Sequence, residues 1–278
     1  MRKVLVLLTM VACSPGPRPA GTGGDDQHSP DAPSHVVDVI ENKLSRVYAH
    51  SGSTLYRVDT TSLTPMIIGE MDVGTQSLTD LAIDKNDNMV GITLDKLYSI
   101  DAGTAHTTLI KDLSQSARGF TSLSYIPADF DDPASEDILV SANDKGEVFR
   151  IDPATGNASM LGTYGTVALG KVISSGDLIG VRGLGIYATV DVGTTGSDYL
   201  AKIDPKTWKA TPLGTGTGFE KIFGLGFWAG TIYGFVDMGS GAGKIIEIDP
   251  NTGAGKEVNT GGVRWYGAGV STDAPVLE

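Results

Sequence analysis

Short segments in which apolar and polar residues alternate recur along the chain from about residue 36 onwards. Alternation with a period of two predicts a half-buried β-strand, and an aspartate after it marks a turn. Five such segments end in aspartate, at Asp59 (LYRVD), Asp101 (LYSID), Asp152 (VFRID), Asp204 (LAKID) and Asp249 (IIEID). The aspartates follow one another at intervals of 42, 51, 52 and 45 residues. A repeat of several short strands over about 40–50 residues is typical of a β-propeller blade.

Four of the repeats predict complete four-stranded blades. Each aspartate strand has one strand after its turn and a pair of strands before it: TDLAID and NMVGIT, TSLSYI and DILVSA, VALGKVI and DLIGVRG, IFGLGFW and TIYGFVD. Two remnants are left over. VRWYGAGVST at Val263–Thr272 reads as an innermost strand without a blade, whereas SRVYAH, LYRVD and PMIIGE read as three outer strands without an innermost one.

Joining the two remnants gives a fifth blade that closes the ring and removes exposed sheet edges. We therefore predict an all-β fold for residues 36–278, a β-propeller of five four-stranded blades in which N-terminal strands pair with the C-terminal strand. A sixth, degenerate blade within Val181–Tyr199 is the open alternative.

The residues of the turns account for the turn conformation. In DPATG and DPNTG the aspartate can accept hydrogen bonds from its own backbone, and proline fixes φ at the next position. Gly156 and Gly253 then suit a position with positive φ. A calcium-binding role for these aspartates is the alternative, but their regular recurrence favours turn chemistry. A chain with 37 glycines and only 19% charged residues fits many short strands and tight turns.

The N-terminus has the order of an export signal. Two basic residues precede a short apolar run and then a small residue, in the segment MRKVLVLLTMVAC. MVAC resembles the lipobox of bacterial lipoproteins, with Met10 in place of the commoner leucine. We predict a signal peptide at residues 1–12 and lipid attachment (palmitate among the acyl groups) at Cys13. An ordinary signal peptide or a buried first strand are the alternatives. Cys13 is the only cysteine, so a disulfide framework is excluded.

Residues 13–35 predict a tether. Ser14–His35 contains five of the 13 prolines, and alanine is its only apolar side chain, so it cannot bury enough surface to fold. In lipoproteins a serine after the lipidated cysteine, here Ser14, resembles an outer-membrane sorting signal. We therefore expect a cell-envelope protein held to a membrane by lipid, with its side of the outer membrane left open. The formal charge of −12 argues against nucleic acid as a partner.

Longer segments carry a family resemblance. GFTSLSYIPADF, SSGDLIGVRGLGIYATVD, GLGFWAGTIYGF and WYGAGVSTDAP, spread over about Gly119–Pro275, resemble a group of uncharacterised bacterial β-propeller lipoproteins. IDPATG followed by LG also resembles the turn repeats of NHL-like and quinoprotein-like propellers. The resemblance implies the fold and the anchor, and it carries over no catalytic residue.

Known catalytic signatures are missing from the sequence. It has no HExxH, no GxSxG and no cysteine pair. Gly165–Lys171 has the spacing of a phosphate-binding loop, but Val172 replaces the Ser or Thr that would hold magnesium. Calcium is conceivable at Asp84–Asn88 or at the acidic segment Pro127–Asp137, although a polar turn and a solvated loop are favoured. We expect no cofactor, with calcium as the alternative.

Propeller geometry directs the search for a ligand to one face. The loops that lead into the innermost strands meet there around the central channel, and aromatic and charged groups that converge on a channel suit a binding site. The candidate ligand-binding residues are Asp80, Arg118, Phe120, Glu220, Lys221, Arg264 and Trp265. We expect Gly183–Tyr199 to be a long insertion on this face. Phe223, Phe227 and Trp228 are expected in the core between blades.

Three functions remain open on the sequence alone. The first is a non-catalytic module that binds a protein, peptide or glycan. The second is a carboxylate-based hydrolase or lyase acting on glycans, for which Asp80 and Glu220 are the one acidic pair at the channel. The third is a calcium-stabilised structural role. The sequence favours the binding module.

Overall fold

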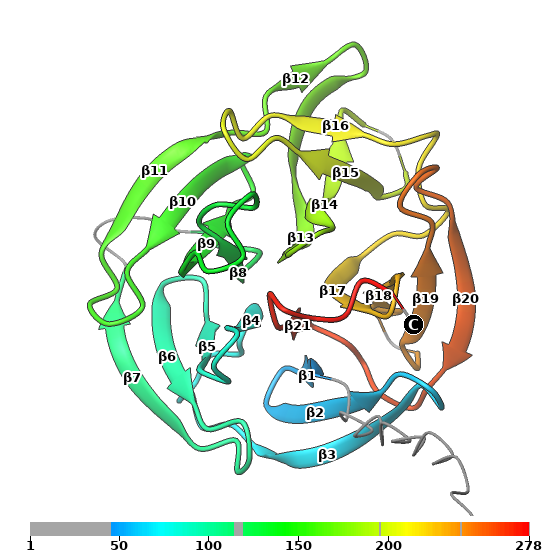
Figure 1. Cartoon of the computed structure of the whole chain (residues 1–278). Coiled ribbons are helices and arrows are strands. Elements are labelled where there is room, and N and C mark those ends of the chain that lie inside the picture. The colour runs from blue at the N-terminus through cyan, green and yellow to red at the C-terminus, as the bar shows by residue number, and fades with distance from the viewer. Residues whose placement is uncertain (1–45, 114–118, 195, 240, 278) are drawn as a thin grey trace, which may run out of the picture. The chain divides into compact units, whose positions relative to one another are not determined.

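The computed structural model describes residues 46–113, 119–194, 196–239 and 241–277. The signal peptide, Cys13, the tether and Arg118 lie outside the described residues. The described chain forms five β-sheets arranged as a ring of blades around a centre, with the innermost strands converging on it (Figure 1). This is the five-bladed β-propeller that the repeats predict. No helix in the described part of the chain has the length and apolar character needed to cross a membrane.

Each blade is an antiparallel sheet, and the strands of each are given from the innermost outwards. Blade 1 is β21 (Gly267–Val270), β1 (Val47–Ser51), β2 (Thr54–Asp59) and β3 (Thr64–Glu70). Blade 2 is β4 (Asp80–Ile83), β5 (Met89–Ile92), β6 (Lys96–Ile100) and β7 (Thr107–Asp112). Blade 3 is β8 (Ser124–Pro127), β9 (Asp137–Ala142), β10 (Glu147–Ile151) and β11 (Ala158–Thr163). Blade 5 is β17 (Ile222–Trp228), β18 (Thr231–Val236), β19 (Lys244–Ile248) and β20 (Gly255–Thr260).

Blade 4 differs from the strand assignment made from sequence. Its strands are β13 (Gly170–Val181), β14 (Gly185–Val192), β15 (Tyr199–Ile203) and β16 (Ala210–Pro212), with β12 (Thr166–Val167) paired to the start of β13. The segments VALGKVI and DLIGVRG fall mainly on one long strand, β13, rather than on two. The pairing register of β13 with β14 shifts between Ser174 and Leu178, and this bulge interrupts the alternation of the sequence. The expected insertion at Gly183–Tyr199 is largely β14, so this region adds no sixth blade to the described sheets.

The two ends of the described chain close the ring. β1 pairs with β21 in antiparallel register, with Val47 opposite Val270 and Tyr48 opposite Gly269. The prediction that Val263–Thr272 supplies the innermost strand of the N-terminal blade is therefore confirmed. All four residues of β21 are buried, which makes this strand part of the core as well as the closure.

The hydrophobic core lies between blades. Each of the four buried clusters takes side chains from neighbouring blades, for instance blades 2 and 3 in one and blades 3 and 4 in another. Trp265 is fully buried between blades 5 and 1, with edge-to-face contacts to Tyr56 and Phe235 at centroid distances of 5.5 and 5.2 Å. Such contacts stabilise by about 0.5–1.5 kcal/mol each beyond the area that they bury.

The recurrent aspartates cap their own turns, as the sequence predicts. In each, a carboxylate oxygen accepts hydrogen bonds from the backbone N–H groups two and three residues later, as for Asp152 with Ala154 and Thr155. These bonds lower the pKa of Asp59, Asp152, Asp204 and Asp249, whereas at Asp101 the bond from the Thr104 hydroxyl lowers the pKa most and the backbone bonds add to it. Because the folded-state pKa lies below the unfolded one, this stabilisation is lost as the pH falls through the folded-state value.

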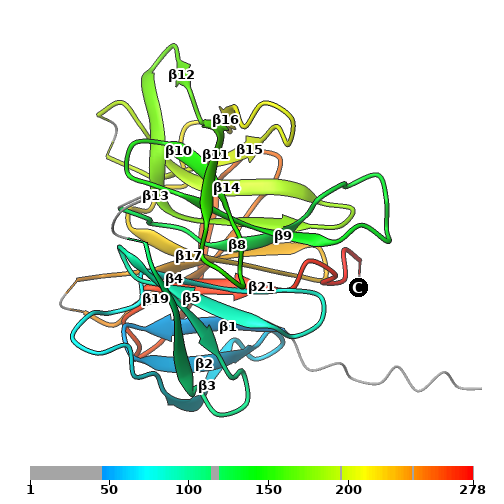
Figure 2. The same ribbon diagram turned by 90° about the vertical axis from the view of Figure 1, so that its left-hand side faces the viewer.

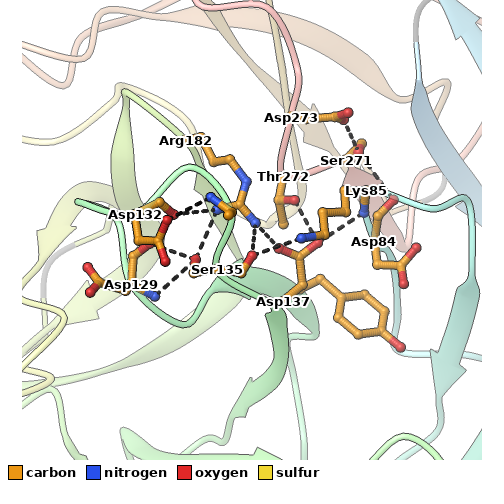
Figure 3. A network of polar contacts seen from close by, with 12 residues as sticks. Asp84, Lys85, Asp129, Asp132, Ser135, Asp137, Arg182, Ser271, Thr272 and Asp273 are labelled. Carbon is orange, nitrogen blue, oxygen red and sulfur yellow. Dashed lines mark hydrogen bonds and ion pairs between the residues drawn. The ribbon is translucent and has the colours of Figure 1, made fainter.

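We call the face where the chain enters each innermost strand the top face, and the opposite one the bottom face. Figure 2 shows the C-terminal end and the β8–β9 loop projecting on the same side, which is the bottom. Asp137 joins that loop to its surroundings: it accepts bonds from the Arg182 guanidinium (2.6 Å), the Thr272 hydroxyl (2.7 Å) and the backbone N–H of Lys85 (3.0 Å) (Figure 3).

Further contacts link the C-terminal tail to the blades on the bottom face. The Arg182 backbone N–H donates to the carbonyl of Thr272 (2.8 Å), so the C-terminal tail is bonded to blade 4 as it crosses this face. Blades 2, 3 and 4 and the tail are thus tied together beneath the channel. The last residue of the acidic segment Pro127–Asp137 has a structural role, because the Asp137 side chain is only 4% exposed and is hydrogen-bonded to its neighbours.

Candidate binding groove on the top face

The top of the channel is lined by one residue from each blade. A cavity of about 160 Å³ lies at the centre of the ring, and its lining residues are Thr79, Thr121, Ser175, Phe223 and Tyr266. Four of these lie within the first residues of an innermost strand or in the segment leading into it. Ser175 instead sits in the β13 bulge. We call this the central cavity. Two of its five side chains are aromatic, and they come from the neighbouring blades 5 and 1.

Two further cavities adjoin the central one. The first, of about 280 Å³, shares Ser175 and Phe223 with it and is lined on its far side by carboxylates; we call it the acidic compartment. The second, of about 290 Å³, shares Thr79 and Tyr266 and is otherwise lined by Gln76, Ser77, Leu78, Thr93 and Leu94; we call it the lateral compartment. Because the shared residues connect them, the three form one groove across the mouth of the ring, the top-face groove.

The acidic compartment contains a pair of hydrogen-bonded carboxyls. Asp198 follows the β14–β15 turn and Asp191 lies near the end of β14, and a hydrogen bond joins the two side chains. Burial raises the pKa of Asp198 to about 7 and also raises the pKa of Asp191. One Asp198 oxygen accepts the backbone N–H of Ile222 at 2.8 Å. Glu220 and Lys221 are exposed at the rim. The compartment therefore holds a proton near neutral pH.

A second carboxyl pair forms the floor beneath the central cavity. Asp80, the first residue of β4, and Asp177, in the β13 bulge, are both fully buried and hydrogen-bonded to each other. Burial raises the pKa of Asp177 to about 8, while burial and the neighbouring Asp177 charge raise the pKa of Asp80 well above its usual range. The two carboxyls therefore titrate as a pair. Two carboxyls this close cannot both ionise at low cost.

The floor pair also bonds the blades together. One Asp80 oxygen accepts the N–H of Leu81 (2.8 Å) and the other that of Leu123 in blade 3 (2.7 Å). Asp177 accepts the N–H groups of Leu178 and Leu225, both at 2.6 Å, and Leu225 belongs to blade 5. Blades 2, 3, 4 and 5 are thus connected through two side chains at the axis.

Blade 1 meets this pair through His50 and Gly267. A Cβ on Gly267 would lie 2.4 Å from His50 Nε2 and 2.6 Å from Asp80 Oδ1, so both atoms crowd the space that the glycine leaves free. His50 is fully buried, neither ring nitrogen has a hydrogen-bond partner among the described residues, and burial lowers its pKa to about 3. A neutral imidazole therefore packs beside Asp80, and only glycine fits at position 267.

The structure brings three of the predicted ligand-binding residues to this region. Glu220 and Lys221 line the acidic compartment, and Asp80 lies in the floor. Arg264 is half exposed at the rim, where it makes two bonds to Asp237 (2.7 and 3.0 Å) and stacks over the Tyr266 ring at 5.1 Å. Arg264 thus positions the Tyr266 ring, which forms one wall of the central cavity.

Two predicted residues are instead in the core. Phe120 and Trp265 are both 0% exposed to solvent, and Phe120 packs edge-to-face on Phe149 at 5.8 Å. Their rings fill the space between blades, so neither presents a surface to a ligand. Conversely, Phe223 lines the groove although the sequence predicts it in the core, while Phe227 is buried as predicted.

Several groove residues are absent from the sequence prediction. They are Thr79, Thr121, Ser175, Asp191, Asp198, Phe223 and Tyr266, and the sequence prediction also lacks Asp177 of the buried floor. A signal for three of them was present, because Thr79, Thr121 and Tyr266 are direct neighbours in sequence of the predicted Asp80, Phe120 and Trp265. Side chains of adjacent residues in an extended chain point to opposite sides. A prediction that is wrong by one residue therefore names a side chain that points away from the groove.

Neither metal binding nor the expected glycosidase pair finds support in the described residues. Within them no group of three or more His, Cys, Asp or Glu is arranged to hold a metal ion. Asp84, the start of the calcium alternative, caps its own turn through the N–H groups of Asn86 and Asn88. Asp80 is fully buried with both oxygens bonded, so it is not accessible to a substrate. The two hydrogen-bonded pairs, Asp80–Asp177 and Asp191–Asp198, are also closer together than the roughly 5–9.5 Å that separates the two carboxyls of a glycoside hydrolase.

Comparisons with known proteins support the fold alone. No family model matches the sequence, and no curated protein is significantly similar to it. A symmetrical protein, solved in work on how folding constraints shape its de novo evolutionary emergence, has 15% identity and a TM-score of 0.51, covering 83% of this chain and all of that one. A puromycin hydrolase has 16% identity and a TM-score of 0.40, covering 77% of this chain and 34% of that one. An oligogalacturonate lyase in complex with manganese has 12% identity and a TM-score of 0.38, covering 75% and 60%.

Proposed function

We propose that this protein is a lipid-anchored binding module of the bacterial cell envelope whose ligand occupies the top-face groove. One observation carries the proposal: five blades each contribute one residue to a single cavity at the axis on the top face, and the buried Asp80–Asp177 pair lies further along the innermost strands. A concave site at the axis, with two aromatic rings and a few convergent polar groups, has the composition of a ligand site. Because the cavity lies among top-face residues, we expect a ligand to arrive from the top face.

The carboxyls of the groove favour binding over hydrolysis. Asp80 is buried, Asp191 and Asp198 are in hydrogen-bond contact, and the sequence carries no nucleophile motif. The resemblance to propeller lipoproteins implies only the fold and the anchor. A non-catalytic binding module therefore accounts for the groove without requiring any further catalytic group.

The groove is tested with the double variant Phe223→Ala, Tyr266→Ala. Removing both aromatic walls is expected to reduce capture of envelope proteins, peptides and glycans by the full chain at least tenfold, because the aromatic rings supply most of the apolar contact area. The matched control is Asp129→Ala, Asp131→Ala on the bottom face, which should capture normally. Unchanged capture by the aromatic variant, with a normal denaturation midpoint, would place the site elsewhere. Trp265 is unsuitable for this test because its replacement would disturb the core.

The anchor is tested at Cys13. Replacing it with alanine removes the only thiol that can carry acyl chains, and stable attachment needs more than one chain, each stabilised by roughly 0.8 kcal/mol per buried CH₂. We expect the variant to leave the membrane fraction and appear in the soluble envelope fraction on cell fractionation. Retention of Cys13→Ala in the membrane fraction would contradict the lipoprotein assignment.

A further inference from the structure

We propose that the occupant of the top-face groove is an extended basic peptide segment, with a lysine or arginine side chain in the acidic compartment and an apolar side chain in the central cavity. This inference rests on the proposed function and names the ligand class of the same site. Its basis is the form of the groove, its charge and its aromatic walls.

The form of the groove suits an extended chain. Three compartments adjoin one another across the ring mouth, with Thr79 and Tyr266 shared on one side of the centre and Ser175 and Phe223 on the other. Together they fall in the range of roughly 300–1,000 Å³ that ligand sites occupy, but divided into parts of about 160 to 290 Å³ each. A peptide in extended conformation presents every second side chain to such a row of compartments.

The charge at one end is negative and has few cationic neighbours. Asp191, Asp198 and Glu220 line the acidic compartment, and among the described residues Lys221 is the one basic residue in its lining. Arg264, the basic group of the neighbouring rim, is already paired bidentately with Asp237. Charge complementarity therefore selects a cationic ligand.

The walls agree with this selection. Phe223 adjoins both the central cavity and the acidic compartment, so a lysine or arginine stem can pack on its ring while the charged end reaches the carboxylates. Tyr266, from the neighbouring blade 1, offers a second ring in the central cavity. Cations over aromatic faces gain attraction from the ring quadrupole in addition to the ionic contact.

A cation in this compartment also displaces a proton. The Asp198 pKa of about 7 and the raised Asp191 pKa mean that the pair is partly protonated at neutral pH. The charged groups facing Asp198 are Asp191 on β14 and Glu220 and Lys221 before β17; Ser175 of the β13 bulge faces it without a charge. A positive charge between them favours the ionised form of both carboxyls. Binding is therefore stronger above the Asp198 pKa than below it.

The experiment measures binding of defined probes to the full chain by fluorescence anisotropy. The probes are a labelled six-residue peptide in which a lysine and a phenylalanine stand two positions apart, so that both face the groove, the same peptide with glutamate for lysine, a neutral hexasaccharide and spermidine. We expect the lysine peptide to bind best, and its affinity to rise about three- to tenfold between pH 6 and pH 8, as the acidic compartment loses its proton. Spermidine alone should bind at least tenfold more weakly, because it leaves the central cavity unfilled.

The charge assignment is tested with the variant Asp198→Asn, Glu220→Gln and a matched control, Asp131→Asn, Glu136→Gln, which removes the same charge from the bottom face. The groove variant should lose at least tenfold in lysine-peptide affinity and its pH dependence, while the control keeps both. Equal loss in the two variants would reduce the effect to overall charge and overturn the inference.

Other outcomes separate the inference from the proposed function. Preferential binding of the hexasaccharide, of the glutamate peptide or of spermidine, lost in Phe223→Ala, Tyr266→Ala, overturns the ligand class and supports the groove. Failure of every probe, with envelope capture still lost in that aromatic variant, likewise overturns the basic peptide and leaves the groove standing. If the aromatic variant changes neither probe binding nor capture, both proposals fall.

Discussion

Replacing Asp177 by alanine is expected to destabilise the folded protein by about 3–5 kcal/mol, a large part of the roughly 5–15 kcal/mol that stabilises a typical domain. The substitution leaves the buried N–H groups of Leu178 and Leu225 without acceptors, and each unsatisfied group costs about 1–3 kcal/mol. It also removes the carboxyl to which Asp80 is bonded. Urea denaturation followed by circular dichroism measures the change, with the slope m unchanged if only stability is affected.

The matched control is Asp152→Ala, an aspartate whose hydrogen bonds lie in an exposed turn. The urea-denaturation midpoint of Asp152→Ala should shift far less than that of Asp177→Ala, because water replaces the lost hydrogen-bond acceptor. Asparagine is not a neutral replacement at position 177: both Asp177 oxygens accept N–H groups, and an amide nitrogen cannot accept. A midpoint for Asp177→Ala equal to that of Asp152→Ala would mean that the floor pair does not connect the blades.

A chain ending at Tyr266 is expected not to yield soluble folded protein, which amounts to loss of the whole stability of the domain. The truncation removes β21, whose four residues are all buried, and the tail that bonds Arg182. It leaves the inner edge of β1 unpaired, and an exposed edge strand is a template for aggregation. Soluble yield and size-exclusion chromatography measure the effect.

The control chain ends at Pro275. It keeps β21 and the bond from the Ala229 N–H to the Pro275 carbonyl (2.8 Å), so it should fold with a near-normal midpoint. A synthetic peptide of residues 267–277, added during refolding, should recover soluble protein from the chain ending at Tyr266. A soluble chain ending at Tyr266 with an unchanged midpoint would show that closure through β21 is dispensable.

The fold is predictable because its signals are local and repeated. Each blade carries a half-buried strand ending in an aspartate that caps its own turn, and the two unpaired remnants leave one way to complete the ring. The strand prediction for blade 4 is wrong for a physical reason. The bulge at Ser174–Leu178 breaks the period of two, so one strand reads as two and β14 reads as an insertion.

The candidate site is predictable in position and not in its individual side chains. Trp265 and Tyr266 are neighbours in extended chain, yet one is buried between blades and the other lines the groove. Phe120 and Thr121 repeat the same relation. Asp177 is hidden by the bulge that turns it toward the axis, and its pairing with Asp80, 97 positions earlier, depends on the closed ring. No local pattern encodes such contacts.

The floor pair is central to both the stability and the site, because its two carboxyls connect the blades under the groove and burial raises the pKa of both. Carboxyl ¹³C NMR of aspartate-labelled protein between pH 4 and 9 tests it directly. Because the folded-state pKa of Asp177 is raised to about 8, an aspartate resonance should titrate near pH 8 and be missing in Asp177→Ala, and stability should decline as the pH rises toward this value. The Asp198 resonance, identified with Asp198→Asn, should titrate near pH 7. If every aspartate other than Asp198 is ionised by pH 6, the floor carboxyls hold no proton at neutral pH and the proposed floor is wrong.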